Sequence, residues 1–281
     1  MTYSELVEAG VKQLADAGFE EARTDVRILV SFVCHMDFMT LLRDGGEQVP
    51  KEQEERFFSL LSERRNHVPV QYLTGEQEFC GLTFSVGKGV LIPRPETELL
   101  AEEVFKNCAG KRVLDMCTGS GCIAVTVEKL GDPAFMAASD YSSEALVIAK
   151  ENAKRLGAQV TFFHGDLFEP VEGCYDMIVS NPPYIKSDVV DGLMPEVKEF
   201  EPRMALDGKS DGLYFYRRIG KEAKDYLVPE GRLLFEIGHD QGEEVSVILA
   251  DEGYTEIVVK KDYAGLDRMV FAVWPGENKE I

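Results

Sequence analysis

The last two thirds of the chain alternate between short apolar runs and segments with helical periodicity, and this alternation constrains the fold most. The apolar runs that predict strands are 112–116, 134–139, 160–164, 177–180, 231–236, 255–260 and 268–274. Helical spacing of apolar residues lies between them, at 123–130, 142–156, 212–227 and 241–251. Such alternation is typical of a mostly parallel sheet with helices on both faces. The sequence therefore predicts an α/β fold with a seven-stranded sheet.

The first 75 residues have a different pattern, which predicts a set of short helices. Apolar residues repeat at helical spacing over 6–14 and again over 26–33, where Thr24 and Asp25 are expected to cap the second helix. Asp37 is expected to cap a short third helix, and Pro50 suits the first turn of a fourth. A further short helix is predicted at 70–73. This segment is expected to be a helical domain that recognises the substrate.

Residues 78–92 alternate apolar and polar side chains with period two, which predicts a β-hairpin. Gly87-Lys88-Gly89 is its expected turn. The predicted organisation is a helical domain at 1–76, a hairpin linker at 77–95 and an α/β domain at 96–281.

Composition excludes several classes of function. The formal net charge is –20, which opposes binding to duplex nucleic acid because such proteins neutralise phosphates with a basic face. The six cysteines form no CxxC pair and do not cluster with the four histidines, so neither a zinc site nor a disulfide framework is expected. No apolar run approaches the roughly 18 residues of a membrane span. We expect a cytoplasmic protein without metal or membrane contact.

The segment Asn181-Pro182-Pro183-Tyr184 directly follows an apolar strand. Two prolines fix φ and restrict the residue before each of them, so the chain there must be extended and stiff. In open α/β sheets, ligands bind just beyond the carboxyl ends of the strands. This segment is therefore the main candidate for the reacting centre.

A second candidate is the glycine turn that follows the strand at 112–116. Gly119 and Gly121 permit a tight turn and a close approach of a ligand to the backbone. The spacing fits the dinucleotide fingerprint, which alone is a weak signal. Asp140, at the end of the next strand, is placed to accept hydrogen bonds from the two ribose hydroxyls of an adenosine cofactor. Asp115 could face a cationic ammonium or sulfonium group, or could be a turn-capping acid.

Taken together, these segments resemble the class I S-adenosylmethionine-dependent methyltransferases, with their Rossmann-like fold. More narrowly, the chain resembles the bacterial release factor glutamine methyltransferases. The resemblance runs nearly end to end. The segments that carry it are Pro69–Gly75, Leu91–Glu98, the glycine turn, Asn181–Ile185, Glu201–Arg203, Ala205–Gly208 and Glu236–Gly242.

The resemblance implies a substrate, a cofactor and site residues. The family methylates the side-chain amide nitrogen of the glutamine in the Gly-Gly-Gln loop of release factors, converting S-adenosyl-L-methionine to S-adenosyl-L-homocysteine. It implies a monomeric enzyme with a release factor as its protein partner. The implied cofactor-binding residues are Cys117, Thr118, Gly119, Ser120, Gly121, Asp140, Leu167 and Asn181. Cys117 stands where many relatives have glycine, so we expect that position not to need a positive φ. Leu167 replaces a tryptophan of some relatives and is expected to cover the adenine with less stacking.

The chemistry of an amide acceptor explains the Asn-Pro-Pro-Tyr segment. A carboxamide nitrogen is a poor nucleophile because its lone pair is delocalised. We expect the side-chain oxygen of Asn181 to accept one N–H of the substrate and the Pro182 carbonyl to accept the other, while Pro183 fixes the direction of that carbonyl. Tyr184 is expected to pack against the flat amide. Asn181, Pro182 and Tyr184 are thus the predicted catalytic residues, and Asn181 to Tyr184 the predicted substrate-binding segment.

Other functions share parts of this pattern. An adenine or guanine amino methyltransferase uses the same tetrapeptide but needs an extruded base and a basic groove. A glutamine methyltransferase acting on a ribosomal protein is less well separated by the sequence. A nicotinamide oxidoreductase would fit the glycine turn but has no use for the tetrapeptide. The roles of Arg94, Glu96, Glu98 and loop 185–211 stay open between structure and substrate or cofactor binding.

Overall fold

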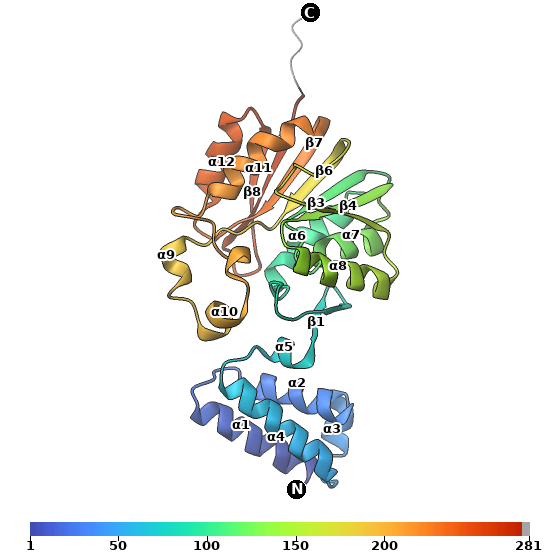
Figure 1. The fold of residues 1–281 in the computed structure, drawn as a ribbon, viewed down its shortest axis with the longest axis vertical. Helices are drawn as coiled ribbons and strands as arrows, with labels where there is room; N and C mark the ends of the chain where they lie inside the picture. Colours follow the sequence, from blue (N-terminus) through green and yellow to red (C-terminus); the bar gives the residue numbers. More distant parts are fainter. Residues whose placement is uncertain (277–281) are drawn as a thin grey trace, which may run out of the picture. The chain divides into compact units, whose positions relative to one another are not determined.

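A computed structural model describes residues 1–276 and divides the chain into two compact units. The first unit contains residues 1–76 together with 194–200, and the second contains 77–193 and the remainder from 201 (Figure 1). No helix among the described residues is long and apolar enough to cross a membrane.

The first unit is all helical. Its elements are α1 (Tyr3–Asp16), α2 (Ala22–Cys34), α3 (Phe38–Arg43), α4 (Lys51–Arg65), α5 (Val70–Thr74) and α10 (Pro195–Phe200). Thr2 caps α1, and the predicted cap Asp37 accepts a hydrogen bond from the Thr40 amide at 2.7 Å. The apolar positions of α1, α2 and α4 form one core that includes Leu6, Val26 and Phe57.

The predicted cap of α2 is wrong. The helix begins at Ala22, with Glu21 in the capping position and no side-chain cap. Asp25 instead lies inside the helix and is buried, where it accepts a hydrogen bond from Arg64 Nε at 2.7 Å. Asp25 therefore serves tertiary packing of α2 on α4 rather than helix initiation.

The second unit is built on a seven-stranded sheet of order β5-β4-β3-β6-β7-β9-β8. Its strands are β3 (Arg112–Met116), β4 (Phe135–Asp140), β5 (Val160–His164), β6 (Tyr175–Ser180), β7 (Leu227–Glu236), β8 (Thr255–Lys261) and β9 (Asp267–Trp274). Strand β9 pairs antiparallel with β7 and β8, and the other pairs are parallel. The prediction of a mostly parallel seven-stranded sheet is confirmed.

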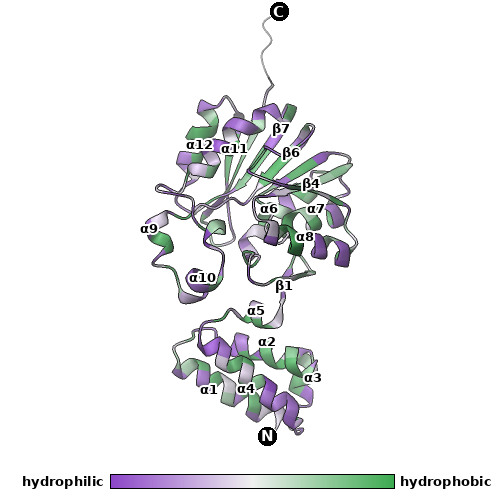
Figure 2. Cartoon of the chain, viewed as in Figure 1, coloured by the Kyte–Doolittle hydropathy of each residue, from purple (hydrophilic) through white to green (hydrophobic). Residues whose placement is uncertain are grey.

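Helices cover both faces of this sheet. Alternate residues of the same strands enter two cores: Val113 and Met177 lie in one, and Leu114 and Ile178 in the other. The first core is closed by α6 (Pro95–Phe105), α7 (Cys122–Gly131) and α8 (Ser143–Leu156). The second is closed by α11 (Tyr214–Glu222), followed by the short η2 (Ala223–Asp225), and by α12 (Gly242–Asp251). Figure 2 shows the strands as the apolar layer between these helices.

The hairpin differs from the prediction. Its strands are β1 (Glu76–Phe79) and β2 (Leu82–Ser85), and its turn is Cys80-Gly81, both with positive φ, rather than Gly87–Gly89. Asn152 of α8 exchanges two hydrogen bonds with the backbone of Ser85, at 2.7 and 3.0 Å. Residues 77–95, predicted as a linker, thus lie within the second unit.

Loop 185–211 is partly ordered into short helices. It contains α9 (Ser187–Val190), α10 and the 3-10 turn η1 (Arg203–Ala205). Because residues 194–200 belong to the first unit, the chain passes between the units at this loop as well as near residue 76. The sequence pattern predicts a boundary near residue 76 but not the inclusion of residues 194–200 in the first unit.

Candidate active site

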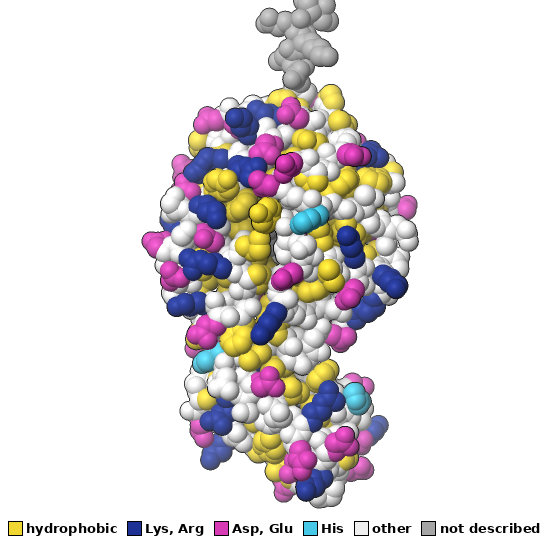
Figure 3. Space-filling model, in the orientation of Figure 1, with side chains coloured by type: hydrophobic (Ala, Val, Ile, Leu, Met, Phe, Trp, Pro, Cys, Tyr) yellow, Lys and Arg dark blue, Asp and Glu magenta, His cyan; other side chains and the backbone are white. Residues whose placement is uncertain are grey.

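A cavity of about 420 Å³ opens where β3, β4 and β6 end, within the second unit. That volume is in the range of sites that bind small molecules. Figure 3 shows apolar side chains gathered along the middle of the larger unit on the face in view. Of the residues predicted from the sequence, those lining the cavity are Cys117, Gly119, Asp140, Leu167, Asn181 and Pro183. Those predicted but outside its lining are Thr118, Ser120, Gly121, Pro182 and Tyr184.

The glycine turn has the expected position but not the expected backbone at Cys117. That residue has φ of 63°, so the prediction that the position does not need a positive φ is wrong. A left-handed conformation costs an L-residue roughly 1–2 kcal/mol, which the surrounding turn must offset. Gly121 has φ of 80°, and a Cβ there would lie 3.1 Å from that of Ala149. The turn thus brings α7 against α8 only because Gly121 has no side chain.

Asp115 is hydrogen-bonded to the glycine turn and to the first turn of α7. Its Oδ2 atom accepts hydrogen bonds from the Thr118 hydroxyl at 2.5 Å and from the Ala124 amide at 3.2 Å. The residue is fully buried and does not line the cavity, and burial raises its pKa to about 7. Of its two interpretations, the turn-capping acid is the one that these contacts support.

Asp140 ends β4 and lines the cavity. Its two carboxylate oxygens accept hydrogen bonds from the backbone amides of Gly119 and Ser142, each at 2.8 Å. These bonds fix the carboxylate at the glycine turn, and each oxygen keeps a further lone pair for a ligand hydroxyl. Burial raises its pKa, and the amide hydrogen bonds oppose that shift.

Asn181 is the first residue after β6. Its Nδ2 atom donates to the Thr97 hydroxyl at 3.2 Å, and its Oδ1 atom has no hydrogen-bond partner within residues 1–276. The carbonyl oxygen of Pro182 likewise accepts no hydrogen bond from the described part of the chain. Asn181 Oδ1 and the Pro182 carbonyl oxygen are therefore two hydrogen-bond acceptors without a protein donor among the described residues. They lie on consecutive residues of a segment that its prolines make rigid.

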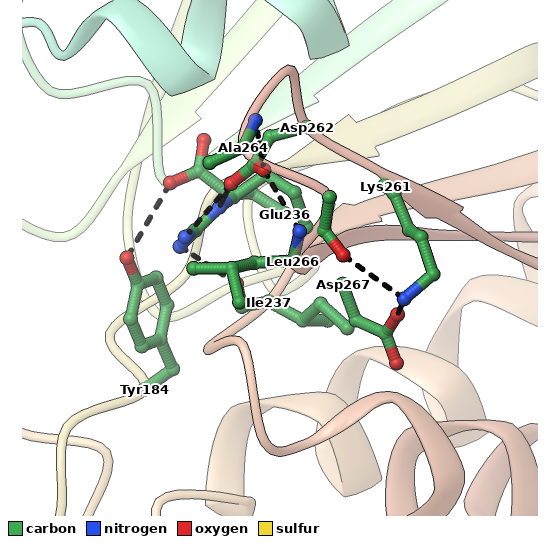
Figure 4. Close-up of polar contacts among 10 residues, drawn as sticks. Tyr184, Glu236, Ile237, Lys261, Asp262, Ala264, Leu266 and Asp267 are labelled. Carbon is green, nitrogen blue, oxygen red and sulfur yellow. Dashed lines mark hydrogen bonds and ion pairs between the residues drawn. The ribbon is translucent and has the colours of Figure 1, made fainter.

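Tyr184, the predicted wall of the substrate site, is held through both its hydroxyl and its backbone carbonyl. Its hydroxyl points to the carboxyl group of Glu236, with 3.4 Å between the oxygen and Oε1 (Figure 4). Burial and this carboxyl raise the pKa of the tyrosine. Its backbone carbonyl accepts from Gln241 Nε2 at 3.1 Å, which anchors the end of the tetrapeptide.

Several cavity residues were not predicted. They come from the segment before α6, from the ends of β4 and β5, from residues 202–209 and from α11, and include Leu91, Tyr141, Asp166, Met204, Lys209, Tyr214, Phe215 and Arg218. Asp166 accepts two hydrogen bonds from Arg218 Nη1, both at 2.9 Å, which join the end of β5 to α11. Tyr141 and Asp166 directly adjoin predicted residues and could have been found from that adjacency. The residues of α11 carried no such signal.

Arg94 and Glu98, in the segment 94–98, both make contacts within the protein. Arg94 Nη2 lies 2.7 Å from both carboxylate oxygens of Glu201, whose side chain is only 1% exposed. Glu98 accepts a hydrogen bond from the Cys80 amide at 3.0 Å. Neither Arg94 nor Glu98 lines the cavity. The salt-bridge interpretation is therefore supported for Arg94, whereas Glu98 has a structural contact with the backbone of the hairpin turn.

Gly212 packs closely against the backbone of Tyr184, the last residue of the Asn-Pro-Pro-Tyr segment. It has φ of 75°, and a Cβ there would lie 2.4 Å from the Tyr184 carbonyl oxygen and 2.8 Å from Gln241 Nε2. We expect Gly212→Ala to lower the free energy of unfolding by about 2–4 kcal/mol, because left-handed strain and overpacking add. It should also reduce activity by displacing the backbone at Tyr184. Urea unfolding monitored by circular dichroism measures the loss.

The matched control for that substitution is Gly87→Ala, which meets no atom within 4 Å and needs no positive φ. It should leave the unfolding midpoint nearly unchanged. Equal midpoints for the two variants would contradict the proposed steric role of Gly212.

The sheet order, the glycine turn and the ligand-sized cavity at the strand ends define a class I methyltransferase fold. Comparisons with known proteins agree. Residues 5–75 match the family model "PrmC N-terminal domain", and residues 95–195 match "Methyltransferase small domain". The chain is 41% identical over 260 residues to a release factor glutamine methyltransferase of Clostridium acetobutylicum, covering 90% of this chain and 91% of that protein. A protein of the same name from Geobacter sulfurreducens is 42% identical over 259 residues, covering 92% and 91%. The chain belongs to the release factor glutamine methyltransferase family.

Solved structures resemble the fold at low sequence identity. A methyltransferase from Pyrococcus furiosus superposes with a TM-score of 0.56 at 19% identity, covering 77% of this chain and all of that chain. The Thermus thermophilus 16S rRNA N2 G1207 methyltransferase, solved with AdoMet and guanosine, gives 0.50 at 15% identity, covering 70% of this chain and 49% of that chain. These likenesses concern the fold alone.

Proposed function

We propose that this protein transfers a methyl group from S-adenosyl-L-methionine to the side-chain amide nitrogen of the glutamine in the Gly-Gly-Gln motif of release factors. The observation that carries the proposal is the pair of free acceptors on Asn181, which lines the cavity at the end of β6, and on Pro182, which directly follows it. The names of relatives about 41% identical over nearly the whole chain support the same substrate class.

Two acceptors suit a primary amide because it carries two N–H bonds. With Asn181 Oδ1 accepting one hydrogen and the Pro182 carbonyl oxygen the other, both N–H directions of the substrate nitrogen are fixed. Fixing them polarises the nitrogen and directs its lone pair. Holding reacting groups in such a geometry supplies about 7–11 kcal/mol of a barrier. The residues therefore act by positioning, without removing a proton before the methyl group is transferred.

The cavity fits an adenosine-containing methyl donor. Asp140 offers carboxylate lone pairs for ribose hydroxyls, and Leu167, which is buried and has φ of 49°, offers an apolar surface for a base. The backbone at Cys117 and Gly119 lines the same space. When bound, S-adenosylmethionine supplies an electrophilic methyl group on a sulfonium. Transfer moves this positive charge from the sulfur to the amide nitrogen, which then loses one proton to solvent to give the neutral N-methyl amide. The fixed oxygen dipoles beside the nitrogen stabilise that developing charge.

The partner that we propose is a release factor in the cytoplasm, bound by a monomeric enzyme. The net charge of –20 favours a protein substrate over duplex nucleic acid, since phosphates would be repelled. The helical first unit is proposed to contribute to recognition of the factor. Its α10 comes from the loop that follows the Asn-Pro-Pro-Tyr segment, so the two are covalently close.

The experiment that tests the proposal is incubation of the purified protein with methyl-labelled cofactor and candidate acceptors, followed by tandem mass spectrometry. Release factors, ribosomal proteins and nucleic acid are offered in parallel. We expect label on the Gly-Gly-Gln glutamine side chain of a release factor. Label on a ribosomal protein or on nucleic acid, with none on release factors, would overturn the proposal.

A further inference from the structure

Loop 185–211 leaves the end of the Asn-Pro-Pro-Tyr segment and returns to it. The amide of Ile185, the next residue of the chain, donates to the Leu206 carbonyl at 3.0 Å. The Ile185 carbonyl accepts from the Gly208 amide at 2.8 Å. These two bonds close the base of the loop beside the proposed reacting centre.

The far part of this loop belongs to the first unit. Residues 194–200, which include α10, form one compact unit with the helices of residues 1–76. Glu196 accepts from Arg64 Nη2 at 2.5 Å, and the two side chains are 16% and 8% exposed. Hydrogen bonds between charged groups are roughly twice as strong as those between neutral groups. Glu196 therefore fixes the far part of the loop to α4.

A second ion pair holds the loop where the chain re-enters the second unit. Glu201 is only 1% exposed, and both of its carboxylate oxygens lie 2.7 Å from Arg94 Nη2. Only residues 197–200 separate the two glutamates, and each glutamate is bound within a different unit. Such a short connection absorbs little displacement, because a chain spans at most about 3.6 Å per residue. The residues directly after it line the cavity, namely Pro202, Met204 and Ala205.

We propose that Glu196 is a positioning residue that makes the enzyme favour a whole release factor over a short peptide containing the same glutamine. The inference rests on the proposed function, in which the helical unit recognises the factor and the tetrapeptide holds the glutamine. A factor that binds both units gains affinity, because its second contact forms at a high effective concentration. That concentration depends on how firmly the two units are connected. Glu196 supplies a second connection besides the chain near residue 76.

A short peptide gains nothing from this connection, because it binds at the tetrapeptide alone. A role of Glu196 in stability alone would instead affect both acceptors equally. Arg64 keeps its hydrogen bond to Asp25 when Glu196 is removed, so its charge remains compensated. Removal of Glu196 is therefore expected to free residues 194–200 from the first unit without unfolding that unit.

The test compares Glu196→Ala with Glu199→Ala in steady-state kinetics on a whole release factor and on a short peptide containing Gly-Gly-Gln. Both substitutions remove a glutamate from α10, but Glu199 is exposed. We expect Glu196→Ala to raise KM for the factor about tenfold and to keep kcat within about threefold of wild type. Its kcat/KM for the peptide should stay within about twofold, because that acceptor uses one binding site only. Glu199→Ala should match the wild type with both acceptors.

The outcomes separate this inference from the proposed function. A wild-type KM for the factor in Glu196→Ala, or an equal loss with factor and peptide, would overturn the positioning role and leave the function intact. If the wild type methylates the factor but not the peptide, the KM for the factor decides alone.

Hydrogen exchange measured on the same three proteins tests the contact without any methylation. We expect the amides of residues 197–200 to exchange faster in Glu196→Ala and at the wild-type rate in Glu199→Ala. If the wild type methylates no release factor, the proposed function fails, and this measurement decides whether Glu196 holds the loop. Equal exchange in the wild type and Glu196→Ala would then overturn the inference.

Discussion

Replacing Asn181 by alanine is expected to lower kcat for methyl transfer about 10²–10³-fold, the scale on which one preorganised hydrogen-bonding group acts in an active site. The substitution removes Oδ1, one of the two free acceptors on the tetrapeptide, and releases Thr97 from its hydrogen bond. The Pro182 carbonyl would remain, so one substrate N–H would still be held. Initial rates with labelled cofactor and a saturating release factor measure the loss.

The matched control is Asn107→Ala, an exposed asparagine that follows α6 and donates only to a backbone carbonyl. It should retain wild-type kcat. Both variants should unfold at nearly the wild-type temperature, because the Asn181 side chain contributes a single hydrogen bond to the fold. Turnover of Asn181→Ala within about threefold of wild type, with the fold intact, would remove this residue from the mechanism.

The sheet could be predicted because its strands are defined by local patterns. Each central strand is an apolar run that is buried on both faces of the sheet. Gly, Pro and Asp residues, which favour turns, follow these runs and indicate where each strand ends. The Asn-Pro-Pro-Tyr segment was recognisable for a related reason, since prolines restrict the backbone from within the sequence. Its position at the end of β6 follows from those two local facts.

The remaining parts of the site depend on contacts between distant residues, which local patterns do not encode. Thr97 and Asn181 are 84 positions apart, and nothing near either residue in the sequence indicates that their side chains meet. The positive φ of Cys117 was missed because a residue with a Cβ seldom adopts it; tertiary packing of the turn overrides that preference. Asp25 was taken for a cap because acidic residues favour helix starts, whereas its partner Arg64 lies on another helix.

The largest effect on stability is expected at Arg64, which joins three segments of the first unit. Its Nε atom donates to Asp25 at 2.7 Å, its Nη2 atom to Glu196 of α10 at 2.5 Å, and its guanidinium lies 4.3 Å from the centre of the Phe19 ring. The arginine side chain is 8% exposed, and those of the two carboxylates are 9% and 16% exposed. Removing one partner of a buried ion pair costs about 3–5 kcal/mol, because a charge is left buried without compensation. We therefore expect Arg64→Met to lower the free energy of unfolding of this unit by that amount, measured by urea unfolding.

The pH dependence of that loss identifies its cause. Burial already raises the pKa of Asp25, and Arg64 opposes the shift, so without the arginine the pKa should rise further. A carboxyl whose pKa is raised by folding favours the folded state as the pH decreases, since the protonated form is the easier one to bury. The deficit of Arg64→Met should consequently shrink between pH 7 and pH 5. Arg23→Met is the control: its ion pair with Glu8 is exposed on both sides, so little change is expected at either pH. A deficit in Arg64→Met that is equally large at both pH values would mean that lost packing on Phe19, and not the uncompensated carboxylates, destabilises the variant.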